Sequence, residues 1–251
     1  MIRKTKIIFE SGRILNSKML NELQNFSLRN IEIKYYDYSN GIIEGLNFES
    51  DNQYLYLTPG FLKYNNEYYF LNEKMIVMSF DEKGGQKYIY LSLKEPEERE
   101  NIYIKELELV ISNEELDESV IYLGKFQHYQ NSSIKTDYKT LEDIGQAGNY
   151  INIVNRKYAG KIAATLSPEI LYFYAKRVMN EVFSSNLDNY IFNKGLNREI
   201  VEMDILKEYL KNTDDFKELY LEFLNKKFLK QEKNKEEKKN KQEKTFMFES
   251  C

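Results

Sequence analysis

Turn-forming residues recur at short intervals between residues 37 and 129, and this pattern constrains the fold more than any other feature of the sequence. They separate short runs rich in Tyr, Ile, Leu and Phe, most of which are residues that favour β-strands. Closely spaced strands joined by tight turns are typical of an antiparallel sandwich or barrel. The turn signals are Ser39-Asn40-Gly41, Asp51-Asn52, Pro59-Gly60, Asn65-Asn66 and Gly84-Gly85.

Two of these runs show the strand pattern most clearly. The sequence KYNNEYYFL, residues 63–71, places Asn-Asn between two aromatic runs and predicts a hairpin. In KYIYLSL, residues 87–93, aliphatic residues alternate with tyrosine or serine, so one face should be core and the other half-exposed. Further strands are predicted at 102–111 and 119–128, whereas the acidic stretch at 95–100 is interpreted as a solvated loop.

The periodicity of the sequence changes after His128 from that of strands to that of helices. Ser167-Pro168-Glu169 predicts a helix start, with a hydroxyl N-cap, proline at the first helical position and an acid in the first turn. Gly195 is predicted to end a helix of about residues 187–194, and Asn197 to cap the next helix. We therefore expect an α+β protein with a β-domain at 1–130 and a small α-helical bundle at 131–229.

The last predicted helix begins near Asp214 and has one apolar face. Because a small bundle needs less apolar surface than this face provides, we assign the face to contacts between subunits. The residues assigned to oligomerisation are Phe216, Leu219, Tyr220 and Phe223.

Charge is distributed unevenly along the chain. Residues 226–244 contain nine Lys and four Glu, a net +5 in a chain whose net charge is −4, so the remainder is acidic. Since this segment has too little apolar surface to offset its ordering entropy, we expect a charged flexible tail at 230–251. Its lysines are mixed with glutamates and include no arginine, so nucleic acid is not an expected partner. The terminal FMFESC, residues 246–251, is interpreted either as weak packing on the body or as a docking peptide.

The single cysteine, Cys251, excludes a disulfide within one chain and fits a reducing compartment. No apolar run approaches the ~20 residues of a membrane span. Residues 1–15 lack the apolar region of a secretory signal. We expect a soluble, cytoplasmic protein without direct membrane insertion.

The sequence contains none of the common catalytic motifs, such as a phosphate-binding GxxxxGK[ST] loop, HExxH, GxSxG or GxGxxG. His128 is the only histidine, and the sequence offers it neither a nucleophile nor an orienting partner. We therefore interpret His128 as structural. The chain is predicted not to be an enzyme and to have no catalytic residues, cofactor or metal.

Carboxylates and tyrosines leave one alternative function open, a carbohydrate-binding or carbohydrate-acting β-sandwich protein. Glycoside hydrolysis needs only two suitably spaced carboxylates, and carboxylates are abundant in this chain, as in the acidic stretch that includes Glu97 and Glu98 and in Asp214-Asp215. Sheet tyrosines can form a ligand platform or a protein interface, or they can simply cover a sheet face. The tyrosines concerned are Tyr54, Tyr56, Tyr64, Tyr68, Tyr88 and Tyr90.

Residues 7–26, IIFESGRILNSKMLNELQNF, pass from β-branched and aromatic residues through a glycine into a helix-like run. This stretch resembles the N-terminal signature of the baseplate adaptor family of type VI secretion systems (the TssK family), which usually has Trp at the position of Phe9. Residues 37–50 and 55–71 are similar to paired strands of that family and of phage-tail baseplate proteins, and residues 167–183 to the helix after the family's sandwich. The matching N-terminal positions are Ile7, Ile8, Phe9, Gly12, Ile14, Leu15, Leu20 and Gln24.

The resemblance implies a shoulder-like β-sandwich on a helical bundle, assembled as a homotrimer. It implies a structural adaptor in the baseplate of a contractile injection system, of the type VI or phage-tail-like kind. Such an adaptor links baseplate wedge proteins to a peripheral module. Family members that contact the membrane complex carry a C-terminal β-rich head. Here the predicted helices lead directly into the charged tail instead, so a membrane-complex or receptor-binding partner would be bound through the tail. On this basis we assign partner binding to Phe9, Gly12, Ile14, Leu15 and Leu20.

Overall fold

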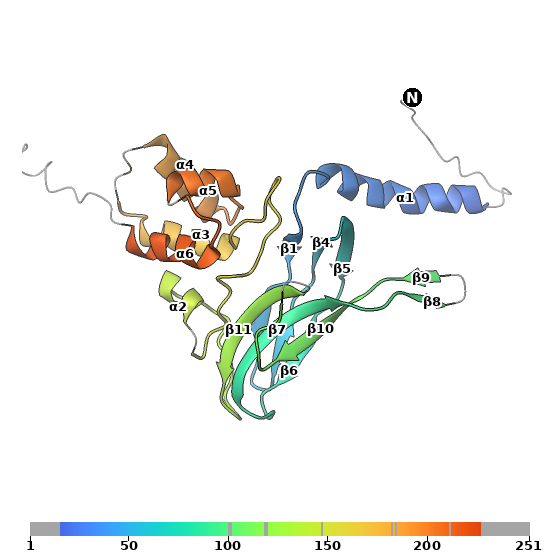
Figure 1. Cartoon of the computed structure of the whole chain (residues 1–251), viewed down its shortest axis with the longest axis horizontal. Helices are drawn as coiled ribbons and strands as arrows, with labels where there is room; N and C mark the ends of the chain where they lie inside the picture. Colours follow the sequence, from blue (N-terminus) through green and yellow to red (C-terminus); the bar gives the residue numbers. More distant parts are fainter. Residues whose placement is uncertain are drawn as a thin grey trace, which may run out of the picture. The chain divides into compact units, whose positions relative to one another are not determined.

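The computed structural model describes residues 16–99, 102–117, 120–146, 148–181, 183, 185–210 and 212–226. It shows a mixed α/β protein with several small antiparallel sheets and a few helices (Figure 1). By its internal contacts the chain divides into two units, Met1–Tyr38 and Ser39–Cys251, and we describe each by itself. The predicted boundary at 130 between a β-domain and a helical bundle stays a prediction.

In the first unit the described structure consists of helix α1 (Ser17–Lys34) and the turn that follows it. The side chain of Asn16 caps the helix by accepting a hydrogen bond of 3.0 Å from the backbone N–H of Met19. At the other end the N–H of Tyr35 donates to the carbonyl oxygen of Ile31 at 3.0 Å. Lys34 lies in the last turn, where a positive charge interacts favourably with the helix dipole. The predicted helix-like run is confirmed from Ser17 onward.

The second unit begins with strands, as the turn signals predict. Their bounds are β1 (Gly41–Gly45), β2 (Phe48–Ser50), β3 (Tyr54–Leu57), β4 (Gly60–Tyr64), β5 (Glu67–Leu71), β6 (Met75–Ser79), β7 (Gly85–Leu93), β8 (Glu97–Arg99), β9 (Ile102–Ile104), β10 (Leu107–Ser112) and β11 (Ile121–His128). They form three-stranded sheets in the orders β1-β4-β5, β2-β3-β6 and β10-β7-β11, together with the hairpin β8-β9. Every pairing between these strands is antiparallel.

The predicted hairpin at 63–71 is confirmed. Asn65 and Asn66 connect β4 to β5 with φ angles of 50° and 62°, both in the left-handed region. A two-residue loop with both central residues in this conformation matches the twist of the flanking strands, and asparagine tolerates the conformation better than most residues. Tyr64 and Glu67 consequently face each other as the first pair of the ladder.

The interpretation of 95–100 as a solvated loop is wrong for Glu97–Arg99, which form strand β8. Its partner β9 belongs to a segment predicted as one strand over 102–111, and the structure divides that segment into β9 and β10. The hairpin β8-β9 extends from the ends of β7 and β10 (Figure 1). Charged residues are compatible with a strand here because Glu97, Glu98 and Tyr103, which faces Glu98, are exposed.

Helices follow the strands along the chain. They are α2 (Leu141–Gly145), α3 (Pro168–Arg177), α4 (Asn186–Leu196), α5 (Met203–Tyr209) and α6 (Phe216–Asn225). The predicted start at Ser167 is confirmed, because its side-chain oxygen accepts a hydrogen bond from the N–H of Glu169 at 3.3 Å. The last helix begins one residue after its cap, Asp215, which accepts a 2.8 Å hydrogen bond from the N–H of Lys217.

The predicted role of Gly195 as a helix stop is wrong. Gly195 lies inside α4, Asn197 is its C-cap rather than the N-cap of α5, and α5 follows Glu202. A Cβ atom on Gly195 would lie 2.4 Å from the carbonyl oxygen of Leu171 and 2.9 Å from Cβ of Ala175. The glycine therefore allows α4 to pack closely against α3.

One apolar core runs through the second unit, from the sheets into the helices. The segment between β11 and α3 joins them, because Asn152 exchanges backbone hydrogen bonds of 2.7 and 3.0 Å with Lys125 of β11. Tyr158 forms a further bridge to Ile42 of β1. Fully buried residues such as Leu123 of β11 and Ile170 of α3 thus belong to the same core. None of the described helices is both long and apolar enough to cross a lipid bilayer.

Candidate functional site

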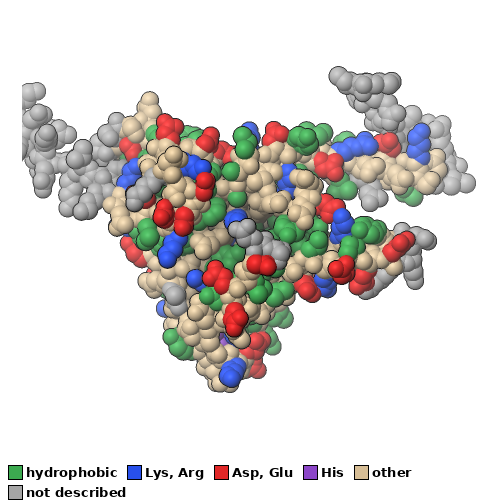
Figure 2. All heavy atoms as spheres, viewed as in Figure 1, with side chains coloured by type: hydrophobic (Ala, Val, Ile, Leu, Met, Phe, Trp, Pro, Cys, Tyr) green, Lys and Arg blue, Asp and Glu red, His purple; other side chains and the backbone are tan. Residues whose placement is uncertain are grey.

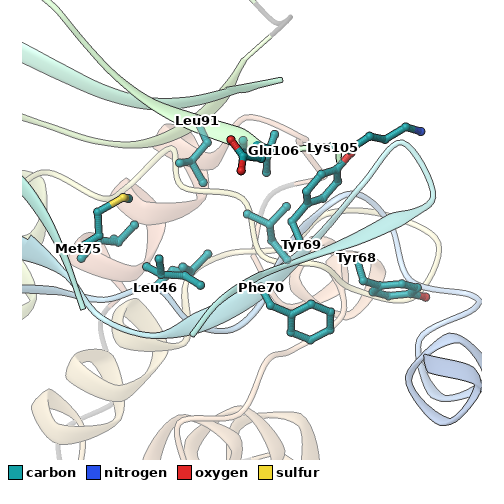
Figure 3. A pocket seen from close by; sticks show the side chains of 12 residues that line it. Leu46, Tyr68, Tyr69, Phe70, Met75, Leu91, Lys105 and Glu106 are labelled. Atoms are coloured by element: carbon teal, nitrogen blue, oxygen red, sulfur yellow. The ribbon is translucent and has the colours of Figure 1, made fainter. Parts of the chain in front are cut away.

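An apolar cavity of about 430 Å³ lies where the three-stranded sheets of the second unit approach one another. Leu46, Met75 and Leu91 converge on it from the end of β1, the start of β6 and the middle of β7 (Figure 3). Leu57, Leu62, Leu71 and Leu107 complete most of the apolar wall. Its volume lies in the range typical of small-molecule pockets.

A polar group of three side chains lies at the edge of the cavity. Glu67 of β5 accepts a hydrogen bond of 2.5 Å from Nζ of Lys105 at one carboxylate oxygen and one of 2.9 Å from the hydroxyl of Tyr69 at the other. The hydrogen bond from Lys105 holds the pKa of Glu67 below its usual range. Burial raises the pKa of Tyr69 to about 12, with a further contribution from its hydrogen bond to Glu67. All three groups therefore keep their usual protonation states at neutral pH.

Exposed apolar side chains surround this region. Phe70, which also lines the cavity, is stacked on Phe61 at 5.4 Å between ring centroids and is still 44% exposed. Ile102 and Tyr103, on the hairpin β8-β9, are each more than 60% exposed. Figure 2 shows hydrophobic side chains beside acidic and basic ones over this hairpin and the strands at its base. Such a surface can accept an apolar side chain from another molecule, with the hairpin providing additional contact area.

Helix α1 presents a second apolar surface. Leu20, Leu23, Phe26 and Ile33 are all exposed, with 68% of the Phe26 residue surface and 77% of that of Ile33 accessible. Met19, Leu23, Phe26 and Ile33 follow one another at intervals of four, three and seven residues. These intervals correspond to one or two helical turns, so the four side chains share one face of the helix. Partner binding was predicted for Leu20 but not for Phe26 or Ile33.

The other predicted partner-binding residues, Phe9, Gly12, Ile14 and Leu15, lie outside the described residues. The same holds for the predicted tail at 230–251, including FMFESC and Cys251. Leu20 is the one predicted partner-binding residue that the structure places, and it is exposed as a docking role requires. Its role stays a prediction.

The residues assigned to oligomerisation lie mostly in the chain's own core. Leu219, Tyr220 and Phe223 of α6 are buried, and Phe216 is half-buried. The hydroxyl of Tyr220 donates to the carbonyl oxygen of Leu141 at 2.8 Å, and the ring of Phe223 packs 4.5 Å from that of Tyr174. This face was predicted to join subunits, whereas in this structure it holds α6 against α2 and α3.

His128 is fully buried at the end of β11, where Nε2 forms a 3.1 Å hydrogen bond with the carbonyl oxygen of Glu82. Its ring packs near the rings of Phe80 and Phe126. Glu97 and Glu98 are exposed on β8. These positions do not bring the histidine and the two carboxylates together, and the carbohydrate alternative stays a prediction.

The tyrosines proposed as a platform are distributed over several sheets and are less exposed than expected. Tyr54 and Tyr56 lie on β3, with 6.0 Å between their ring centroids. Tyr88 and Tyr90 of β7 are stacked at 6.3 Å, but Tyr90 is buried and its hydroxyl accepts a hydrogen bond from the N–H of Leu116. Exposure was therefore predicted wrongly for Tyr90, because the ring of Tyr122 packs on it at 5.7 Å and the segment at Leu116 lies against its hydroxyl.

Among the described residues no group of three or more His, Cys, Asp or Glu side chains is arranged to hold a metal ion. Comparisons with protein-family models, with curated proteins and with solved structures return no match to this chain.

Proposed function

We propose that this chain is a non-enzymatic structural adaptor in the baseplate of a contractile injection system or phage-tail-like particle. It links wedge proteins to a peripheral module. The observation that carries the proposal is the exposed apolar face of α1, because a surface of this kind on a soluble protein marks an interaction site. The resemblance of residues 7–26 to the type VI adaptor family supports the same role, since α1 is the helix in which that stretch ends.

The subunits form a homotrimer through α1. Met19, Leu23, Phe26, Asn30 and Ile33 follow one another at intervals of four, three, four and three residues, which is the spacing of a coiled-coil seam. Asn30 interrupts the apolar residues, and a single polar residue at such a position selects the register and the number of helices. This assignment replaces α6, whose apolar face is used within the chain.

In this proposal the small sheets form a shoulder-like β-sandwich and the helices a small bundle beside it. A wedge protein inserts an apolar side chain into the cavity between Leu46, Met75 and Leu91 and packs against the hairpin β8-β9. Phe9, Gly12, Ile14 and Leu15 add contacts to the wedge, and the tail reaches the peripheral partner. The assembly works in the cytoplasm.

Co-expression with the products of neighbouring genes tests this function, because an adaptor should be encoded beside sheath, tube and wedge proteins. We expect a wedge protein to co-purify with the chain. Light scattering should give a mass close to three times the 30.0 kDa of one chain. A strict monomer both alone and with the wedge protein would contradict the proposal.

The docking stretch is tested by Phe9→Ala and Leu15→Ala, compared by thermal unfolding and by pull-down with the wedge protein. Interface anchors contribute to binding and not to folding. We expect unchanged unfolding temperatures and lost pull-down. Loss of folding together with binding would instead assign these residues to the core.

A further inference from the structure

Arg156 is the most deeply buried charged side chain of the described residues. It is 1% exposed and lies in the segment between α2 and α3. Its guanidinium donates from Nη2 to the carbonyl oxygen of Leu46, and the rings of Phe48 and Tyr158 lie 5.4 and 5.7 Å from its central carbon. The aromatic faces stabilise the cation but cannot accept its hydrogen bonds in the way an anion does.

The guanidinium lacks an anionic partner among the described residues. Its Nε is buried without a hydrogen-bond acceptor, and no described carboxylate lies within 4.0 Å of it. A buried cation is costly unless it is paired and hydrogen-bonded, and a buried donor without an acceptor adds to that cost. Glu169, which lines the same cavity, interacts with this charge only at longer range, so the arrangement favours a further anion in contact with the guanidinium.

A cavity of about 240 Å³ lies beside Arg156, and its carboxylates are already paired. Their partners are Lys74 for Glu49 at 2.9 Å, Lys139 for Asp137 at 2.6 Å, and Arg198 for Glu169. Burial raises the pKa of Glu169, and the positive charges of Arg198 and Arg156 oppose that rise. The positive charge of Arg156 therefore acts within the cavity.

We propose that this cavity binds a carboxylate group, held by the guanidinium of Arg156. The hydroxyl of Thr136, which also lines the cavity, provides a further donor. A carboxylate suits the site better than a phosphate. It carries one negative charge, whereas a phosphate dianion would be repelled more strongly by Glu49, Asp137 and Glu169. This site is separate from the apolar cavity and from α1, so it does not depend on the proposed adaptor function.

The carboxylate can belong to a small organic acid or to an acidic side chain of another protein. Binding to the full chain is measured by calorimetry and by thermal unfolding, with sodium acetate and a blocked aspartyl peptide as probes. Sodium chloride at equal ionic strength is the reference. We expect acetate to raise the unfolding temperature above the chloride value, because a ligand that binds only the folded state stabilises it. Binding of the peptide as well would identify the site as open to protein side chains, whereas binding of acetate alone would restrict it to small acids.

Arg156→Met and Glu169→Gln identify the residues, and Arg177→Met is the control. Arg156→Met should abolish acetate binding, whereas Arg177→Met should leave it unchanged, because Arg177 pairs with Glu142 outside the cavity. Glu169→Gln removes a nearby negative charge and should tighten acetate binding by roughly tenfold. This second variant decides the question if Arg156→Met does not fold.

Three results would overturn the proposal. The first is equal stabilisation by acetate and chloride, and the second is an acetate affinity that Glu169→Gln leaves unchanged. The third is tighter binding of phosphate than of acetate, which would contradict the assignment to a carboxylate.

Discussion

The hydroxyl of Tyr209 donates a hydrogen bond of 2.9 Å to Oδ1 of Asp188, and both residues are buried between the helices of the second unit. The same hydroxyl oxygen lies 2.7 Å from that of Tyr174. Oδ2 of Asp188 accepts a 2.7 Å hydrogen bond from the hydroxyl of Ser185, which caps α4. This network connects α3, the start of α4 and the end of α5, so its loss should loosen all three helices together.

Tyr209→Phe removes the central hydroxyl of the network and leaves Asp188 and Tyr174 each with one partner fewer. Leaving buried polar groups unsatisfied costs about 1 to 3 kcal/mol. We expect the free energy of unfolding to fall by that amount in denaturant titrations. The matched control is Tyr190→Phe on α4, where the tyrosine is exposed and the change should be close to zero. Equal effects of the two substitutions would show that the network contributes nothing specific.

The stability of the protein should depend on pH through Asp188. Burial alone would raise the pKa of this carboxyl, but hydrogen bonds from Ser185 and Tyr209, aided by the charge of Lys226, hold it below the ordinary value of 3.8. Folding therefore favours the ionised form. The resulting stabilisation is fully present above the ordinary pKa and is lost as the pH falls through the lowered folded-state pKa.

Asp188→Asn should remove this contribution. We expect the unfolding free energy of the variant to vary less steeply with pH than that of the unchanged protein below about pH 4. Asp204→Asn provides the control, because Asp204 is an exposed acid of α5. An unchanged acid slope in Asp188→Asn would show that the carboxylate is not specifically stabilised in the folded protein.

Elements set by short-range chemistry were predictable from the sequence. Asn65 and Asn66 favour the left-handed backbone of a two-residue turn, and the β4-β5 hairpin forms around them. Ser167 and Asp215 cap α3 and α6 close to the expected positions. In each case the residues that determine the structure are within a few positions of one another.

The cavities were not predictable, because distant segments build them. Leu46, Met75 and Leu91 carry no local sign that they line one pocket, and their meeting depends on the order of the strands in three sheets. Two of the residues around the Arg156 side chain, Leu46 and Phe48, are likewise about a hundred positions away in the sequence, and only Tyr158 is close to it. One signal was available for the hairpin β8-β9, since Ile102, Tyr103 and Ile104 form a strand-like run directly after the acidic stretch.

Gly195→Ala tests the close approach of α3 and α4. In an exposed helix this change stabilises by about 1 kcal/mol, because alanine has the higher helix propensity. Here the added Cβ would meet the carbonyl oxygen of Leu171 at 2.4 Å, so the helices must separate. We expect a net loss of about 1 to 3 kcal/mol in unfolding free energy, as for other overpacked sites. Gly148→Ala, where an added Cβ meets nothing within 4 Å, should change the stability far less.

The double variant Leu23→Asp with Phe26→Asp tests whether α1 joins the subunits. Each side chain would contribute about 1.5 to 3 kcal/mol if buried between helices, and an aspartate in its place would have to be desolvated without a partner. In the single chain both residues are already exposed, so the substitutions remove little buried apolar surface. We expect light scattering to give the mass of one chain, with the circular dichroism of a folded protein.

The matched control for this variant is Asn21→Asp, which adds a negative charge to an exposed position of α1 away from the apolar face. It should leave the oligomer intact, because the seam of Met19, Leu23, Phe26 and Ile33 is unchanged. Dissociation in both variants would indicate a general effect of charge on the helix. An oligomer that survives in the double variant would exclude α1 as the joining element and would leave the homotrimer without a structural basis in the described residues.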